Sequence, residues 1–146
     1  MPERKGYSYR HRGQDFPTVS FTEDLHDKVL RESGGRVGVL KTDLLESALE
    51  KPVVTVGGED AYPTLFSKVA AIGHSIAHGH VFQDGNKRTA VEVMLITLYW
   101  NGFKRRPNQT AIETTILLVA AGYLNVEGLR MALLHMYGLD PANSSF

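Results

Sequence analysis

The feature that most constrains the fold is an almost wholly apolar segment in the middle of the chain. From Val91 to Trp100 the run is interrupted only by Glu92 and Thr97. Apolar residues lie on every side of a helix drawn over residues 86–100, and such a helix has to be buried. It is also too short to cross a bilayer. The segment therefore predicts the central helix of a soluble helical domain, which ends at Asn101-Gly102.

The rest of the chain is dominated by apolar residues at helical spacing. We predict five more helices, each bounded by a capping residue, a proline or a glycine. They run from Phe21 to Gly34 with Ser20 or Thr22 as the cap, over residues 42–50, from Pro63 to His78, from a Thr110–Glu113 capping box to Gly122, and from an Asn125 cap to Gly138.

Two regions do not show this spacing. The β-branched run Val53–Val56, followed by Gly57-Gly58, predicts a short β-like flap. Residues 1–18 are polar and basic, which indicates a poorly ordered, flexible arm. The expected organisation is thus an all-α single domain over residues 19–140, with that arm before it and a short polar tail (residues 141–146) after it.

Composition excludes several function classes. Sixteen basic and sixteen acidic residues balance, so overall charge gives no reason to expect direct nucleic-acid or membrane binding. The absence of cysteine excludes disulfides, thiolate metal sites and a cysteine nucleophile. The first residues lack the apolar run of a signal peptide. We expect a cytoplasmic protein. His26, among charged neighbours, is expected to be a surface or hydrogen-bonded residue rather than a functional one.

The chemically richest stretch lies directly before the apolar helix. It is His80-Val-Phe-Gln-Asp-Gly-Asn-Lys-Arg88, called the signature segment below. The free N–H groups and the dipole at a helix start favour an anion such as a phosphate, and Lys87 and Arg88 add charge there. Histidine titrates near neutral pH, so His80 suits proton transfer. Gly85 allows the backbone to turn its N–H groups inward.

The signature segment resembles the motif of the Fic/Doc family. Val81 in place of proline, and above all Lys87 in place of a glycine, are similar to the Doc (death-on-curing) toxin branch. Leu25-His26 with Gly34-Gly35, and Tyr62 to Leu65 with Lys68, are also Doc-like. The resemblance covers roughly residues 20–138 and implies a Fic/Doc-type helical bundle.

The resemblance also implies a function. Doc toxins are protein kinases that phosphorylate elongation factor Tu, block translation and are neutralised by Phd-type antitoxins. By this resemblance His80 would be the base, Asp84 would hold Mg²⁺, and Phe82 would anchor the loop. The γ-phosphate donor would be ATP, and its phosphates would be bound by Gly85, Asn86, Lys87 and Arg88. A lysine in place of glycine fills space and adds charge, so it favours a different placement of the phosphates.

Several alternatives remain at this point. Fic relatives transfer AMP to a protein hydroxyl instead, and a catalytically silent binding module is a second alternative. His74 and His78, one helical turn apart, have a spacing that suits zinc. Lys104-Arg105-Arg106 is either a solvated connection or a nucleic-acid patch. The flap is either an ordinary loop or, as in Fic enzymes, an edge that aligns the target, through Val54, Thr55, Val56 and Gly57.

Overall fold

The computed structural model describes residues 6–38, 41–143 and 145–146. This part of the chain is mostly helical, as predicted, with two small antiparallel hairpins. The α-helices are α1 (Val19–Ser33), α2 (Thr42–Glu50), α3 (Leu65–Gly79), α4 (Asn86–Trp100), α5 (Gln109–Ala120) and α6 (Val126–Met136). The other elements are the 3-10 helix η1 (Lys51–Val53) and the strands β1 (Ser8–His11), β2 (Gln14–Pro17), β3 (Thr55–Val56) and β4 (Glu59–Asp60).

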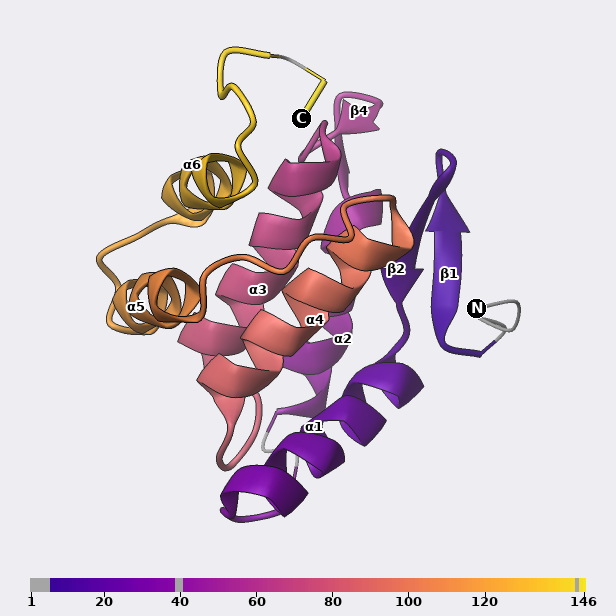
Figure 1. The fold of residues 1–146 in the computed structure, drawn as a ribbon. Coiled ribbons are helices and arrows are strands. Elements are labelled where there is room, and N and C mark those ends of the chain that lie inside the picture. Colours follow the sequence, from indigo (N-terminus) through magenta and orange to yellow (C-terminus); the bar gives the residue numbers. More distant parts are fainter. Residues whose placement is uncertain (1–5, 39–40, 144) are drawn as a thin grey trace.

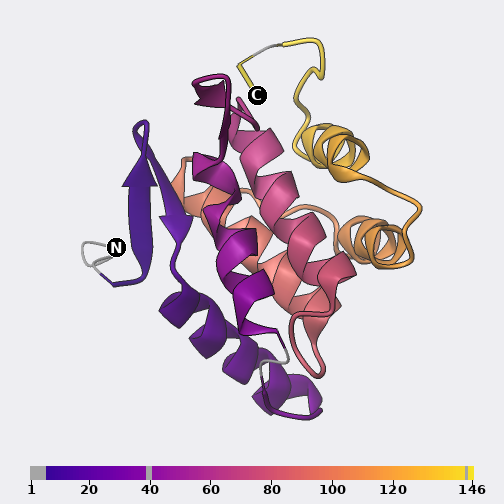
Figure 2. The same cartoon turned by 180° about the vertical axis from the view of Figure 1, so that it is seen from behind.

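Helices α3 and α4 lie side by side at the centre of the domain (Figures 1 and 2). The buried helix over residues 86–100 is confirmed with the predicted bounds, although Tyr99 on its outer side is 47% exposed. The centre is shared, however, because α3 packs against α2, α4, α5 and α6, whereas α4 packs against α1, α3 and α5.

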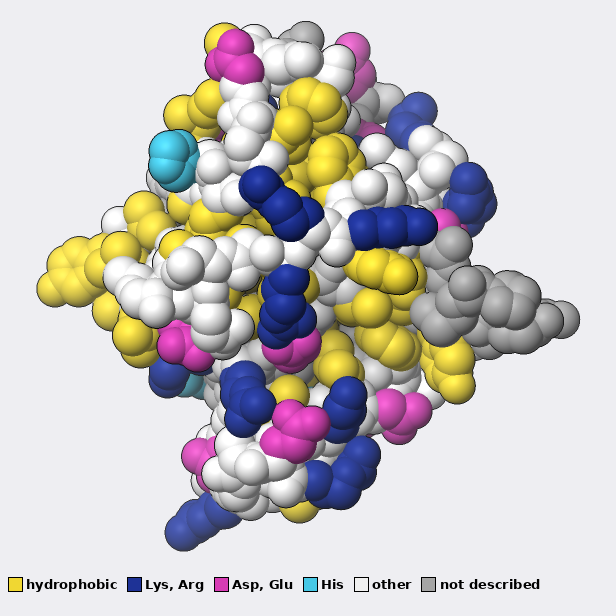
Figure 3. All heavy atoms as spheres, viewed as in Figure 1, with side chains coloured by type: hydrophobic (Ala, Val, Ile, Leu, Met, Phe, Trp, Pro, Cys, Tyr) yellow, Lys and Arg dark blue, Asp and Glu magenta, His cyan; other side chains and the backbone are white. Residues whose placement is uncertain are grey.

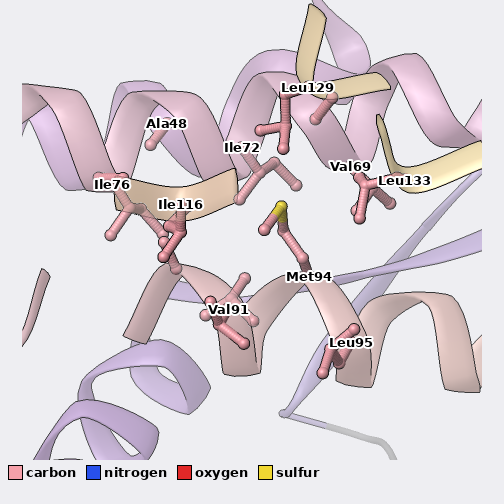
Figure 4. Close-up of a cluster of buried hydrophobic side chains, with 14 of the residues drawn as sticks. Ala48, Val69, Ile72, Ile76, Val91, Met94, Leu95, Ile116, Leu129 and Leu133 are labelled. Atoms are coloured by element: carbon pink, nitrogen blue, oxygen red, sulfur yellow. The ribbon is translucent and has the colours of Figure 1, made fainter. Parts of the chain in front are cut away.

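The contact between α3 and α4 depends on a glycine. Met94 of α4 points into the cluster formed with Ile72, Leu129 and Leu133 (Figure 4). A Cβ atom on Gly73 would lie 2.2 Å from the Met94 sulfur, well inside van der Waals contact. The missing side chain therefore lets the two central helices approach closely.

Three predicted helix starts are corrected by the structure. Thr18, rather than Ser20 or Thr22, caps α1 by accepting a hydrogen bond from Phe21 N. Thr64 caps α3 in a capping box with Ser67, so Pro63 lies before the helix. Asn108 caps α5, so Thr110 lies inside it. The observed cap lies two positions before Ser20 in α1, two positions before Thr110 in α5, and one position after Pro63 in α3. The predicted Asn125 cap of α6 is confirmed.

The prediction of a poorly ordered arm is wrong for residues 6–18, while residues 1–5 lie outside the described residues. Strands β1 and β2 pair as an antiparallel hairpin with Tyr9 opposite Phe16. Phe16 is fully buried, and the Tyr9 hydroxyl donates a hydrogen bond to the Leu49 carbonyl. Burial of the aromatic rings orders this segment, an effect that its polar composition concealed.

The predicted flap is confirmed as the hairpin β3–β4, which joins η1 to α3. Its last residue, Asp60, accepts contacts from Lys68 Nζ at 3.0 Å and Arg12 Nε at 3.0 Å, and lies 3.2 Å from His11 Nε2. The hydrogen bond from Lys68 lowers the pKa of Asp60 to about 2. Asp60 thus connects the flap, the N-terminal hairpin and α3.

The C-terminal tail is not purely polar, because Phe146 packs near other aromatic rings. The ring of Phe146, in the predicted polar tail, lies with its centroid 6.4 Å from Phe66 and 6.0 Å from Phe103. Among the described residues, none of the helices combines the length and apolarity needed to cross a membrane.

Candidate active site

The signature segment forms the turn between α3 and α4 and lies next to α1 (Figures 1 and 2). His80 follows the last residue of α3 in the left-handed conformation, with φ 50° and ψ 50°. This backbone region costs a non-glycine residue about 1–2 kcal/mol. The side chain of His80 is exposed. A strained, solvent-facing histidine at the end of a buried helix is a feature that active sites often contain.

Asn86 closes the turn on itself. Its Oδ1 accepts a hydrogen bond from Phe82 N at 2.9 Å, and its Nδ2 donates to Phe82 O at 2.9 Å. Phe82 is 1% exposed, so both backbone groups need these partners. The amide that we predicted to contact phosphate therefore holds the backbone of the loop in this structure.

His26 is a site residue that our sequence reasoning missed. His26 is only 2% exposed, so the surface position is wrong and the other expected position, in a hydrogen bond, is confirmed. Its Nε2 donates a 2.7 Å hydrogen bond to the carbonyl of Asp84, and its ring stacks on Phe82 with centroids 3.8 Å apart. Its charged neighbours suggested a solvent-facing position, whereas only the Doc-like Leu25-His26 pair pointed to this position.

The segment after α1 holds the other side of the loop. Arg36 N donates to the Asp84 carboxylate at 2.7 Å, and Gln83 N donates to Gly38 O at 3.1 Å. Gly35 has φ 120°, and a Cβ there would lie 3.1 Å from the Asp84 Cβ. The Gly34-Gly35 pair that ends α1 thus permits close backbone approach to the predicted metal-binding carboxylate.

The N-terminus of α4 is open to an anion. Gly85 precedes the helix with φ 80°, and no side chain caps the first turn. The first backbone bond is Thr89 N to Gly85 O, which leaves the N–H groups of Asn86, Lys87 and Arg88 without a helical partner. These groups and the helix dipole favour a phosphate at this end.

The side chains around this helix end carry mixed charge. Arg88 pairs with Glu32 of α1 at 3.2 Å, and Arg106 pairs with Glu92 at 2.8 Å. Lys87 is exposed and forms no ion pair within the described part of the chain. Figure 3 shows basic and acidic side chains interspersed on the lower half of this face, over the region of α1 and the start of α4.

A groove of about 430 Å³ adjoins the basic residues of the segment. This volume lies within the range of small-molecule sites. One wall is apolar and the rest is polar, as a ligand with a base and phosphates requires. The lining residues are Lys87, Arg88, Val91, Glu92, Arg106, Gln109, Glu113, Ile116 and Leu117.

Asp84 has the chemistry of a Mg²⁺ ligand. The carboxylate is exposed, and one of its oxygens, Oδ2, accepts the Arg36 N–H. Magnesium typically binds to one or two carboxylates and completes its shell with water and substrate phosphates, so a single acidic residue beside a phosphate site fits it. Among the described residues no group of three or more His, Asp or Glu side chains could hold a metal.

His74 and His78, the pair with a spacing that suits zinc, lie on α3 before the turn. Burial, with smaller contributions from His78 and Lys51, lowers the pKa of His74. Arg105 donates to Met136 O, and Lys104 lies over the Tyr99 ring.

The flap lies at the opposite end of α3 from the signature segment (Figure 1). The 15 residues of α3 span about 22 Å at 1.5 Å per residue. Val54, Thr55, Val56 and Gly57 are therefore not brought to His80. The segment that contacts the signature segment is instead the one after α1.

The helical bundle and the signature segment match a known protein family. The model of the Fic/DOC family matches residues 16–98, which include the signature segment and more than half of the chain. The chain belongs to the Fic/DOC family.

Two curated relatives of this chain both have Doc in their names. Toxin Doc of Mycolicibacterium smegmatis is 45% identical over 69 residues, which are 47% of this chain and 53% of that protein. The match to this toxin thus spans about half of its length. Protein kinase doc of Escherichia phage P1 is 29% identical over 114 residues, which are 78% of this chain and 89% of that protein.

Proposed function

We propose that this protein is the toxin of a toxin–antitoxin pair and acts as a Mg²⁺-dependent protein kinase. It transfers the γ-phosphate of ATP to a Thr or Ser hydroxyl of a protein target, which we propose is elongation factor Tu. Phosphorylation then blocks translation in the cytoplasm, and a Phd-like antitoxin chain neutralises the activity.

The observation that carries this proposal is the uncapped start of α4 beside Lys87. Three N–H groups at this helix start lack a helical partner, and the side chain of Lys87 in the same turn is exposed. The phage P1 relative, matched over most of its length, has the name of a protein kinase. Phosphoryl transfer consists mainly of positioning and charge neutralisation, and this helix end offers both.

The proposed reaction assigns His80 the proton. The target hydroxyl oxygen attacks the γ-phosphorus, the bond from that phosphorus to the β–γ bridging oxygen breaks, and ADP leaves. The hydroxyl proton passes to the exposed imidazole of His80. The solvent-facing position of His80 lets a protein substrate reach the imidazole.

In this proposal the charge of the phosphates is neutralised by two side chains of α4 and by a metal ion. Lys87 and Arg88 supply positive charge, and for Arg88 this requires the pair with Glu32 to open. The groove between α4 and α5 receives the nucleoside against Val91, Ile116 and Leu117. Asp84 would bind Mg²⁺, which neutralises phosphate charge when bound.

The test is the intact mass of bacterial elongation factor Tu after incubation with this protein, ATP and Mg²⁺. A gain of about 80 Da, one phosphate, supports the kinase. A gain of about 329 Da, one AMP, overturns the transferred group and identifies a nucleotidyl transferase. No gain on this factor or on any protein of a bacterial lysate overturns the proposal in favour of a binding module.

Two variants test the residue roles. His80→Ala should abolish transfer, whereas His78→Ala, which removes an exposed histidine two positions before His80, should retain it. Undiminished transfer by His80→Ala contradicts its role as the base. Lys87→Gly should weaken phosphate transfer or redirect it to AMP transfer, measured by the same mass shift.

A further inference from the structure

The carbonyl of Asp84 is held by a side chain from another helix. His26 of α1 is 58 positions away in the sequence, yet its Nε2 lies 2.7 Å from this oxygen. The bond is short for N–H···O, and it is the tightest contact between α1 and the signature segment in the described part of the chain. The bond acts on the peptide unit that links the predicted metal-binding residue to the helix start.

A trans peptide unit directs its C=O and N–H groups in opposite directions. The Asp84 carbonyl points inward to His26, so the N–H of Gly85 points to the opposite side, away from the buried ring. Gly85 is the residue that precedes the uncapped first turn of α4. A rotation of this peptide unit would turn the N–H of Gly85 away from the phosphate site and would also move the Asp84 side chain.

The hydrogen bond, and not the stacking of the ring, distinguishes this histidine from an apolar aromatic residue. The ring is stacked on Phe82 at an interplanar angle of 9°, which a phenylalanine could reproduce. A buried imidazole costs free energy unless its nitrogen finds a partner. The turn also packs closely against α1 at this point. A Cβ on Gly85 would lie 3.6 Å from Nε2 of His26 and 3.3 Å from a Leu30 methyl.

We infer that His26 is a positioning residue: its Nε2–H fixes the Asp84–Gly85 peptide unit so that Gly85 N–H and the Asp84 carboxylate face the phosphates and the metal ion. The inference deepens the proposed function and rests on it. His26 does not touch the substrate, and its effect passes through the backbone of residues 84 and 85.

Two substitutions separate the two properties of the side chain. His26→Phe keeps a stacked ring and removes the donor. His26→Gln loses the ring but places an amide N–H close to the former Nε2. Tyr9→Phe is the matched control, because it also removes one aromatic donor to a backbone carbonyl, that of Leu49, at the N-terminal hairpin.

The measurements are urea unfolding, the Kd of Mg·ATP by calorimetry, and kcat and KM for phosphate transfer. His26→Phe should lower kcat by about 10- to 100-fold, as expected for a misplaced catalytic group, and should weaken Mg·ATP binding. Tyr9→Phe should change stability alone. His26→Gln should recover most of kcat although it is less stable.

The outcomes distinguish the two claims. If His26→Phe matches Tyr9→Phe in both kcat and Kd, His26 is only a core residue and the inference is overturned. If the wild-type protein binds Mg·ATP but transfers nothing, the proposed function fails, and the Kd values still test the inference. If His26→Phe does not fold, His26→Asn replaces it, since its shorter amide cannot reach the Asp84 carbonyl; equal Kd values for the Asn and Gln variants then overturn the inference.

Discussion

Asn86→Ala separates a role in phosphate contact from a role in loop structure. The change removes two hydrogen bonds, one to Phe82 N and one to Phe82 O. Each is worth about 1 kcal/mol net, and more when a buried group loses its only partner. Alanine returns about 0.5 kcal/mol through its higher helix propensity. We therefore expect a loss of about 2 kcal/mol in the free energy of unfolding.

The assay is urea denaturation followed by circular dichroism, and the matched control is Asn101→Ala. Asn101 makes the same two-way contact with a backbone, since its Oδ1 accepts from Asp15 N and its Nδ2 donates to Asp15 O. It lies at the other end of α4. Asn101→Ala also loses a bond to Thr97 O, so it should lose at least as much stability as Asn86→Ala. Only Asn86→Ala should also lose phosphate transfer and Mg·ATP affinity.

Two results would refute this reasoning. An Asn86→Ala variant of wild-type stability that no longer binds Mg·ATP would mean that the amide faces the ligand and that its contacts with Phe82 are unimportant. Equal loss of activity in Asn86→Ala and Asn101→Ala would mean that activity follows global stability rather than the shape of the turn.

Three further predictions concern the framework around the site. Gly73→Ala should destabilise by about 1–2 kcal/mol, overpacking against Met94 minus the helix propensity of alanine, and urea denaturation of the variant combined with Met94→Ala should show a cost below the sum of the two. Asp60 has a folded-state pKa of about 2, below its ordinary 3.8, so its contribution to stability is present above pH 4 and is lost as pH falls toward 2; thermal melts of Asp60→Asn should lack this transition, and an unchanged acid limb would contradict the role of Lys68. Burial lowers the pKa of His74, so its protonation opposes folding and stability should fall below about pH 6.5; His74→Gln should flatten the melting temperature between pH 7 and pH 5.

The sequence predicted the helices well because their apolar residues repeat locally. The bounds of α2 and α4 were predicted from that spacing and from their flanking Pro52 and Asn101-Gly102. Helix starts were less accurate, since several oxygen-bearing residues competed for each cap and only the backbone conformation decides between them.

The errors share a physical cause, which is long-range packing. Phe16 is buried only because the hairpin reaches the core, and a segment with four cations in its first twelve residues gives no local indication of this. His26 is buried against a partner that is 58 residues away in the sequence, so no local pattern indicates its burial. The short β-like flap was predicted correctly, but its distance from the turn depends on the direction of α3, which spacing cannot reveal.

Most of the hydrogen bonds that hold the signature segment are made to its backbone, and two of its ionisable side chains, His80 and Lys87, are left out of them. Asn86, His26 and Arg36 N hold the turn through two backbone groups of Phe82, the carbonyl of Asp84 and one Asp84 oxygen. His80 and Lys87 are exposed and take no part in these contacts. If the turn served only to connect two helices, its internal hydrogen bonds would suffice and an exposed histidine with a positive φ would be a needless cost. The rigid backbone and the uncommitted side chains make sense together when the side chains act on a ligand, because a fixed turn reduces the entropy lost on binding.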